Sequence, residues 1–377
     1  MPIILKLAAI SHCLSITATQ FFLIIFTIVL LYGVYKKKYD LSKCMYVKYY
    51  LYLLIAGFLS VIFGVDLKRS LISFRDEWLL FYFFVGYFIV PQKIGEKIFN
   101  YLIFGGLIAS FYGFYQYFFK HLERAQGFFS HSLTFGNVMS ILSVMVFSFL
   151  LIKLYKTKME KFYYIFSFIC FVFSVYLSGG RGALIFTVIT LCVAIAIKYG
   201  KKGIYIGGII ILFFTIFAYF AYNNPVINRR LHELANESYS NSMSSIGTRI
   251  ALWKASYRIF LDHPIFGIGY GNFRNVIKNY LDVPVLTTAH AHNAYIQYLV
   301  LHGVIGLIAL LFFFYKIIKK LISCVKEDVI AISGLSIFIV FLLQGLIENN
   351  FYDSEVSMIF WFIIGSVTGM IENKEKA

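Results

Sequence analysis

The stretch SLTFGNVMSILSVMVFSFLLI, residues 132–152, contains no charged side chain and is dominated by large apolar residues. A helix needs about 20 consecutive, mostly apolar residues to cross the hydrocarbon core of a bilayer. Residues 132–152 therefore predict one membrane-spanning helix. The rest of the chain must then be examined for further spans of the same kind.

The whole chain has the composition of a polytopic membrane protein. Of its 377 residues, 60% are hydrophobic and only 14% are charged, and its mean hydropathy is +0.78. A soluble domain is less apolar and carries about 25% charged residues. The sequence predicts an all-α fold with about twelve transmembrane helices, near residues 3–18, 20–35, 47–65, 77–91, 98–119, 132–152, 162–178, 183–198, 203–222, 294–315, 328–347 and 355–371.

These spans divide the chain into three parts. Residues 1–222 hold the first nine spans, residues 223–293 form one long polar loop, and residues 294–377 hold the last three spans and a short tail. Cytoplasmic loops of membrane proteins are enriched in positive charge. If both chain ends are cytoplasmic, most lysines fall in cytoplasmic segments, so the long loop is expected to be periplasmic.

The arginines follow a different distribution from the lysines. Arginine can bind phosphate or carboxylate through two parallel hydrogen bonds, whereas lysine is a point charge. An outer face that is rich in arginine therefore indicates a bound oxyanion, although single arginines can also contact lipid headgroups. On this topology all of the arginines lie on the outer side: Arg69, Arg75, Arg124, Arg181, Arg229, Arg230, Arg249, Arg258 and Arg274.

The long loop predicts three short helical pieces. VINRRLHELANES indicates a polar helix, and IGTRIALWKASYRIFLDHP places Ile246, Ile250, Trp253 and Tyr257 at helical spacing up to Pro264. FGIGYGNF is then a glycine-rich turn whose spacing is not that of a nucleotide-binding motif. NFRNVIKNYLDV predicts a second amphipathic helix that roofs a cavity over the spans, with an apolar face of Phe273, Val276, Ile277, Tyr280 and Leu281.

Polar residues gather where the long loop meets the tenth span. The stretch HAHNAYIQYLVLHGVIG, residues 290–306, puts His290, His292 and Asn293 at the outer end of an apolar helix. Burying such groups without partners is costly, and histidine exchanges protons near neutral pH. These three residues are therefore candidates for substrate contact or catalysis. Glu348, at the outer end of the eleventh predicted span, could hold an arginine or the histidine.

Two further arginines lie in short outer loops. SGGRGAL places Arg181 in a tight turn between two spans, where its flanking glycines would let backbone amides approach an anion. An arginine so close to lipid is a functional candidate by default. HLERAQGFFSHSLTFGN holds Arg124 and His131 before the sixth span.

These motifs resemble the O-antigen ligase family of membrane glycosyltransferases. The resemblance is carried by His292-Asn293, nine residues, Gly303, two residues and Gly306, and by the Gly-Arg-Gly turn, TRIALWKAS and GIGYGNF in the same order. It implies a GT-C-like enzyme of the bacterial inner membrane with a periplasmic active site. Such an enzyme transfers a glycan from undecaprenyl diphosphate to lipid A-core, with inversion and without a metal or other cofactor.

The resemblance also implies roles for single residues. Arg181 and Arg249 match the essential arginines and His292 the essential histidine, while Arg124 matches a looser pattern. Arg124, His290 and Asn293 are expected to bind substrate, with His292 accepting a proton from the acceptor hydroxyl or only orienting the acceptor. Membrane lipids are the only other expected partners, and no nucleic acid is expected.

Two alternatives to a ligase have to be distinguished from it. A polysaccharide polymerase would use the same donor with another acceptor, and the charge pattern does not separate it from a ligase. A transporter of lipid-linked sugar is disfavoured because the polar residues gather at one face and no acidic residue is expected inside the spans.

Asp76 and Glu77 are expected to pair with Arg75, and the five cysteines to be free in helices.

Overall fold

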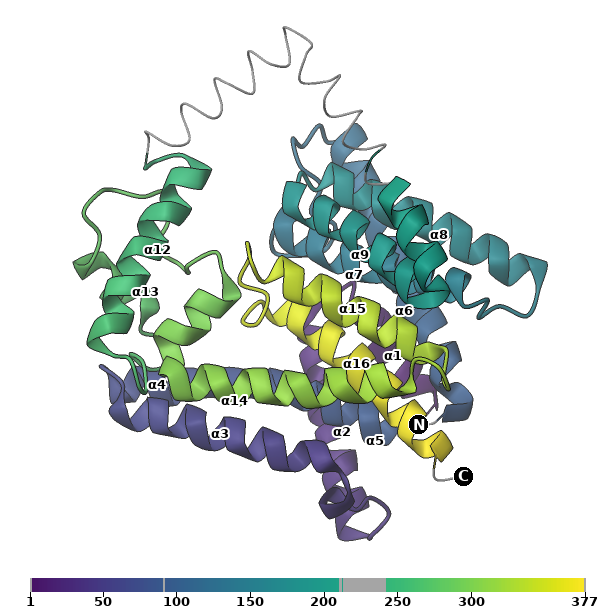
Figure 1. Cartoon of the computed structure of the whole chain (residues 1–377), viewed down its shortest axis with the longest axis horizontal. Helices are drawn as coiled ribbons and strands as arrows, with labels where there is room; N and C mark the ends of the chain where they lie inside the picture. Colours follow the sequence, from purple (N-terminus) through teal and green to yellow (C-terminus); the bar gives the residue numbers. More distant parts are fainter. Residues whose placement is uncertain (1, 91, 210–211, 213–241, 376–377) are drawn as a thin grey trace, which may run out of the picture.

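The structure, a computed structural model, describes residues 2–90, 92–209, 212 and 242–375. In this part of the chain every regular element is a helix (Figure 1). The α-helices are α1 (Pro2–Ser11), α2 (Ile16–Tyr35), α3 (Met45–Phe63), α4 (Leu67–Ser73), α5 (Phe81–Ile89), α6 (Gln92–Phe118), α7 (Ser132–Leu151), α8 (Lys158–Leu177), α9 (Arg181–Tyr199), α12 (Ser245–Asp262), α13 (Phe273–Val276), α14 (Ala294–Cys324), α15 (Ile330–Gln344) and α16 (Ser354–Glu375). Three short 3-10 helices are η1 (Leu41–Lys43), η2 (Phe74–Leu80) and η3 (Ile277–Asn279).

The predicted all-α, multi-span architecture is confirmed. Within the described residues, 8 helices are long and apolar enough to cross a membrane, namely α2, α3, α6, α7, α8, α9, α14 and α16. The other four predicted spans differ. Residues 3–18 are interrupted after Ser11, residues 77–91 are divided between η2 and α5, and α15 has only 15 residues. The span predicted at 203–222 lies largely outside the described residues, as does the polar helix predicted in VINRRLHELANES.

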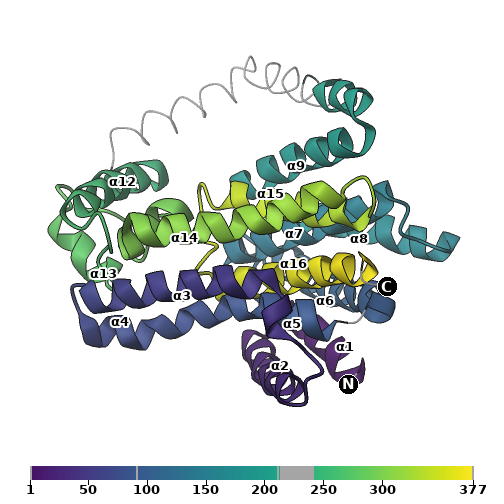
Figure 2. The same ribbon diagram turned by 60° about the horizontal axis from the view of Figure 1, so that its bottom comes forward.

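Two helices form the centre of the bundle. The apolar windows of α16 and α7 are 94% and 83% buried, whereas those of α2 and α9 are only 28% buried. Figures 1 and 2 show the same order, with α7 and α16 in the middle and α2 and α9 on opposite outer sides. A helix that is hydrophobic all round is stable where neighbours surround it. The stretch that predicted the first span, α7, is thus a core helix rather than a lipid-facing one.

Glycines bring α16 against α5 at backbone distance. A Cβ atom at Gly365 would lie 2.0 Å from the Phe83 carbonyl oxygen, and one at Gly369 would lie 2.4 Å from that of Tyr87. Gly86 of α5 has the same relation to the Phe362 carbonyl oxygen, at 2.5 Å. Small residues four apart allow this close approach between membrane helices, where lipid provides no hydrophobic drive for association. GSVTG, residues 365–369, is such a motif.

Helix α14 is broken at Gly303, whose backbone has φ 63° and ψ −169°. The break leaves carbonyl and N–H groups without helical partners, which is expensive away from water. The GIGYGNF turn supplies hydrogen-bond partners for these groups. Ile268 and Gly269 donate their backbone N–H groups to the Val300 and Leu301 carbonyls, at 3.0 and 2.9 Å. The chain before the turn also takes part, because Val304 donates to the Pro264 carbonyl at 2.9 Å. The turn therefore completes a broken helix.

The end of the bundle where α14 begins is called the site end here, and the opposite end the lysine-rich end. At the site end, α12, α13 and η3 pack on the first part of α14 (Figure 1). The predicted face of the second loop helix is confirmed, although it forms only the short α13 and η3: Phe273 and Ile277 are buried, and Val276, Tyr280 and Leu281 pack beside them.

The face of α12 differs from the predicted spacing. Leu252, Ala255 and Ile259 are buried, whereas Ile246 and Tyr257 are 47% and 63% exposed. Apolar residues occur on more than one side of this helix, so periodicity alone did not identify the buried side. The five cysteines are buried and form no disulfide, as predicted.

We predict that Gly267→Ala destabilises the protein by more than about 2 kcal/mol, since left-handed backbone alone costs about 1–2 kcal/mol for a residue with a Cβ. Gly267 has φ 70°, and a Cβ atom there would lie 2.4 Å from the Leu301 carbonyl oxygen. Thermal unfolding in detergent measures the effect. Gly208→Ala is the control, because nothing lies within 4 Å of its Cβ position. Equal melting temperatures for the two variants would contradict the role assigned to the turn.

Candidate active site

The turn that carries His290 and His292 is held by two neighbours and by a hydrogen bond within the turn. Trp253 of α12 donates its indole N–H to the Ala291 carbonyl at 2.8 Å, and Gln297 of α14 accepts the Ala291 N–H at 2.8 Å. The His292 N–H donates to Nδ1 of His290 at 3.2 Å. His292 itself has φ 50°, which is uncommon for a residue with a Cβ and persists only where the surroundings enforce it. The indole of Trp253 and the side-chain amide of Gln297 thus fix the orientation of this turn.

Asn293 is the N-cap of α14. Its Oδ1 atom accepts the N–H groups of Tyr295 and Ile296 at 3.0 and 2.9 Å, and its Nδ2 donates to the Leu346 carbonyl at 2.9 Å. An asparagine at this position satisfies N–H groups that have no partner in the helix. These contacts tie the start of α14 to the α15–α16 loop. Substrate contact by Asn293 stays a prediction beside this structural role.

Glu348 joins two of the predicted site residues. Its Oε1 atom accepts a hydrogen bond from Nη2 of Arg249 at 3.0 Å, and its Oε2 atom lies 3.8 Å from Nδ1 of His292. All three side chains are largely buried: Glu348 is 12% exposed, Arg249 23% and His292 18%. Such partial burial strengthens electrostatic interactions relative to those in water. The expectation that Glu348 holds an arginine or the histidine is confirmed for Arg249, while His292 lies near the same carboxylate without a hydrogen bond to it.

The imidazole of His292 retains an unused nitrogen. Its Nδ1 atom is buried and has no hydrogen-bond partner among the described residues. The separation from Glu348 is too long for a hydrogen bond, yet short enough for a charge on the carboxylate to act on the ring. The His290 ring lies beside it, with 4.2 Å between ring centroids.

His290 is held neutral by its surroundings. Its pKa is lowered to about 4, mainly by burial and also by the neighbouring His292, Arg249 and His131. The Glu348 carboxylate acts in the opposite direction. At neutral pH His290 therefore adds no positive charge, and it can serve as a hydrogen-bonding group.

Arg124 holds the turn that precedes Arg181. Its Nε donates to the Ser178 carbonyl at 2.8 Å, and a Cβ atom at Gly179 would lie 2.7 Å from this Nε. Gly179 has φ 68°, so glycine is needed there for conformation as well as for space. Arg124 is thus placed as a support for the Gly-Arg-Gly turn, while its predicted contact with substrate stays a prediction.

Arg181 is the first residue of α9 and is exposed. Within the described part of the chain its guanidinium has no hydrogen bond or ion pair. The next residue, Gly182, packs against the α15–α16 loop: a Cβ atom there would lie 1.7 Å from Cδ1 of Ile347. Ile347 directly precedes Glu348. Arg181 and Arg249 therefore stand beside adjacent residues of the same loop, although they are not in contact with each other.

The remaining site-end loop is tied to the start of α16. Glu355 accepts hydrogen bonds from the N–H and hydroxyl of Ser130, the latter at 2.6 Å, and Asp353 accepts one from the Thr134 hydroxyl at 2.6 Å. His131 lies between these two anchors. These contacts hold the start of α7 against the start of α16.

A second polar cluster was not predicted. Glu77 is 3% exposed and accepts a hydrogen bond from the Tyr270 hydroxyl at 2.8 Å, whereas its predicted partner was Arg75. His302 is buried beside it, bonded to the Tyr352 hydroxyl and 3.3 Å from the Ser60 hydroxyl. The expectation of no acidic residue inside the predicted spans is thus wrong. Glu77 opens an apolar run, so its position looked like a helix end rather than the interior.

Among the described residues, no group of three or more histidine, cysteine or acidic side chains is placed to hold a metal ion. Independence from metal stays a prediction.

The family model described as O-Antigen ligase matches residues 166–311. Over this stretch the match supports the resemblance to the O-antigen ligase family. The matched stretch holds Arg181, Arg249 and His292, while Arg124 and Glu348 lie outside it. Members of the O-antigen ligase family are membrane glycosyltransferase-like enzymes, either ligases or polymerases. No curated protein matches the sequence.

We predict that Glu348 and Arg249 are energetically coupled. Glu348→Ala, Arg249→Ala and the double variant form a cycle whose coupling energy in thermal unfolding should be about 1–3 kcal/mol, because each single change leaves a partly buried charge unpaired. The exposed pair of Arg258 and Asp282, 2.6 Å apart, is the control and should show a smaller coupling. Additive effects at Glu348 and Arg249 would contradict the arrangement.

We predict that His290 makes stability depend on pH. The unfolded chain protonates this histidine near pH 6.5, whereas the native state does so only near pH 4. Stability therefore falls as the pH drops from about 6.5 towards 4, by up to about 3 kcal/mol, and His290→Gln removes this share of the loss. Melting temperatures of both proteins between pH 7.5 and 4 test this. Parallel curves would show that His290 titrates normally.

Proposed function

We propose that the protein is an O-antigen ligase of the bacterial inner membrane. It transfers a glycan from undecaprenyl diphosphate to lipid A-core oligosaccharide on the periplasmic face. The observation that carries this proposal is the partly buried cluster of Arg249, Glu348 and His292, with Arg181 beside the same loop.

The site end is proposed to face the periplasm. The arginines of the described loops lie at this end, and the lysines concentrate at the opposite end, as the positive-inside rule requires for a cytoplasmic side. No nucleotide sugar is available on the outer side of the membrane. The donor must therefore arrive already activated, and a polyprenyl diphosphate glycan places its diphosphate at the interface next to α9 and the histidine turn.

Arg181 and Arg249 are proposed to bind the diphosphate. In the described part of the chain the guanidinium of Arg181 has no protein partner. Arg249 bonds Glu348 through its Nη2 alone. A hydrogen bond to a charged group contributes about 1.5–3 kcal/mol. The contribution grows as negative charge develops on the leaving diphosphate, so these arginines favour the transition state over the bound donor.

His292 is proposed as the general base. The carboxylate of Glu348 near Nδ1 favours the tautomer with the proton on Nδ1, which leaves Nε2 to accept the proton of the acceptor hydroxyl. The acceptor oxygen then forms a bond to the anomeric carbon while the bond from that carbon to the diphosphate breaks. This single displacement inverts the anomeric configuration, and Glu348 stabilises the resulting imidazolium.

Transfer in vitro tests the proposal, with purified protein, an undecaprenyl-diphosphate-linked glycan and lipid A-core. His292→Ala and Arg181→Ala should each lower the rate by at least about 10²-fold, as expected for loss of a general base or of a transition-state contact. His263→Ala and Arg274→Ala are matched controls outside the cluster and should retain the activity. The assay contains a chelator, since no step uses a metal.

The acceptor is tested in a parallel reaction. A polymerase would extend a second lipid-linked glycan and leave lipid A-core unmodified, so this product pattern would replace the ligase assignment while keeping the same site. Full activity of His292→Ala on both acceptors would refute the role of His292.

A further inference from the structure

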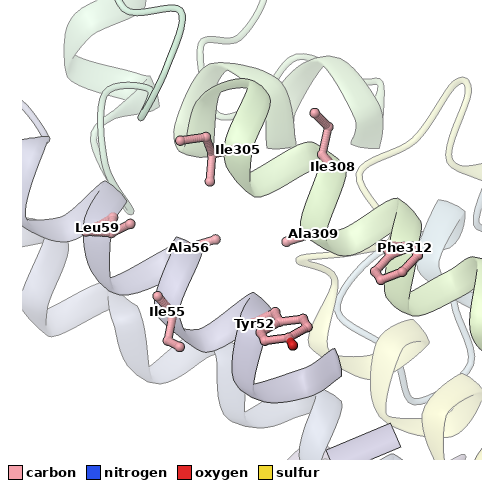
Figure 3. Close-up of a pocket in the computed structure, with 8 residues that line it drawn as sticks. All are labelled: Tyr52, Ile55, Ala56, Leu59, Ile305, Ile308, Ala309 and Phe312. Carbon is pink, nitrogen blue, oxygen red and sulfur yellow. The ribbon is translucent and has the colours of Figure 1, made fainter. Parts of the chain in front are cut away.

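A hollow lies between α3 and α14 at the surface of the bundle (Figure 3). Ala56 of α3 and Ala309 of α14 face each other across it, and their small side chains leave a cavity of about 330 Å³. Ile55 and Ile308 stand at its rims and are 57% and 61% exposed. The lining is apolar throughout, except for the hydroxyl of Tyr52.

The hollow is bounded towards the site end. Its last lining residues there are Leu59 and Ile305. Beyond them Phe63 stacks on Phe266 of the glycine-rich turn, with 4.4 Å between ring centroids. Ile305 lies two residues after the break of α14 at Gly303, and its N–H donates to the Ile265 carbonyl at 3.4 Å. The groove thus does not continue along α3 towards the histidine turn.

Two lysines stand at the other end of the hollow. The ammonium group of Lys48 lies 5.8 Å from the ring centroid of Tyr52, and that of Lys316 lies 5.0 Å from that of Phe312. Tyr52 and Phe312 both line the hollow. Lys316 also lies 4.9 Å from the ring of Tyr49, so it is positioned between α3 and α14. Neither lysine makes an ion pair with any carboxylate that the structure describes.

We propose that this groove binds an anionic glycerophospholipid from the leaflet at the lysine-rich end. The phosphate lies between Lys48 and Lys316, and one acyl chain fills the hollow over the two alanines. From Tyr52 to Leu59 the helix rises by about 10 Å, which matches the upper half of an acyl chain in one leaflet. The aromatic rings at the mouth sit where tyrosine is favoured, at the membrane interface.

Charge selects the ligand class. A polybasic site gains about 1 kcal/mol for each lysine near an anionic membrane surface. Two lysines without carboxylate partners therefore distinguish phosphatidylglycerol from zwitterionic lipids with the same acyl chains. The undecaprenyl chain of the donor is the competing occupant, but its diphosphate belongs at the site end, on the closed side of the groove.

Thermal unfolding of the purified full chain in mixed micelles tests the proposal, with phosphatidylglycerol or phosphatidylcholine of matched acyl chains as the probe. The wild-type protein should be stabilised by phosphatidylglycerol at a concentration at least tenfold lower than by phosphatidylcholine. Lys48→Glu/Lys316→Glu should abolish this preference. Lys161→Glu is the matched control, because Lys161 also lies over a tyrosine ring, at 5.8 Å from that of Tyr155, but away from the groove.

Two further measurements keep the test decisive. Ala309→Leu fills the hollow and should reduce stabilisation by both lipids. If the charge-reversed Lys48→Glu/Lys316→Glu variant does not fold, Lys48→Gln/Lys316→Gln is used in its place. An unchanged preference for phosphatidylglycerol in the lysine variants would overturn the proposal. So would displacement of the lipid by undecaprenyl diphosphate at equal concentration, which would assign the groove to the donor. No glycan transfer is measured, so the result is independent of the proposed function.

Discussion

The structure depends on how the backbone of α14 is satisfied at its break. In lipid, an unpaired carbonyl or N–H group costs several kcal/mol, so a helix can be interrupted only where other protein groups replace the missing hydrogen bonds. Here the turn at residues 264–269 supplies donors and acceptors on both sides of Gly303. Gly267, whose φ is positive, allows this turn to lie against α14, while Gly269 and Gly271, also with positive φ, lie against residues 64–73.

The break determines where the histidine turn lies. Because α14 changes direction at Gly303, its first part leaves the bundle axis and packs under α12 and α13 (Figure 1). Its N-terminus then meets the α15–α16 loop, to which Asn293 and Ala294 are hydrogen-bonded. A continuous helix would have carried His292 straight on from the bundle, away from Glu348. The motif of two glycines after the histidine is therefore part of the geometry of the site.

Glu348 organises the charges at the site end. It bonds Arg249, acts on His292 and raises the tendency of His290 to protonate, against the larger effect of burial. Because Glu348 is paired with Arg249, the remaining positive charge is that of Arg181, which is free of protein partners in the described residues. Such a surface favours an anion, and the fixed arginine and histidine lose little freedom when one binds. The opposite end has lysines over aromatic rings, which suits headgroups rather than catalysis.

The sequence by itself determined that the chain is an all-helical membrane protein and which residues can carry chemistry. Both follow from local properties: the length of apolar runs, the cost of arginine and histidine beside lipid, and the order of the motifs. Glu348 was predicted as a partner because it lies at the outer end of the eleventh predicted span. The tertiary structure alone decided that Asn293 is a helix cap, that Trp253 and Gln297 hold the histidine turn, and that Glu77 is buried against Tyr270. It also decided that Leu252 rather than Ile246 faces inward on α12. Each of these depends on contacts between residues far apart in the chain, and in a protein that is apolar on most faces, periodicity cannot tell which face meets a neighbour and which meets lipid.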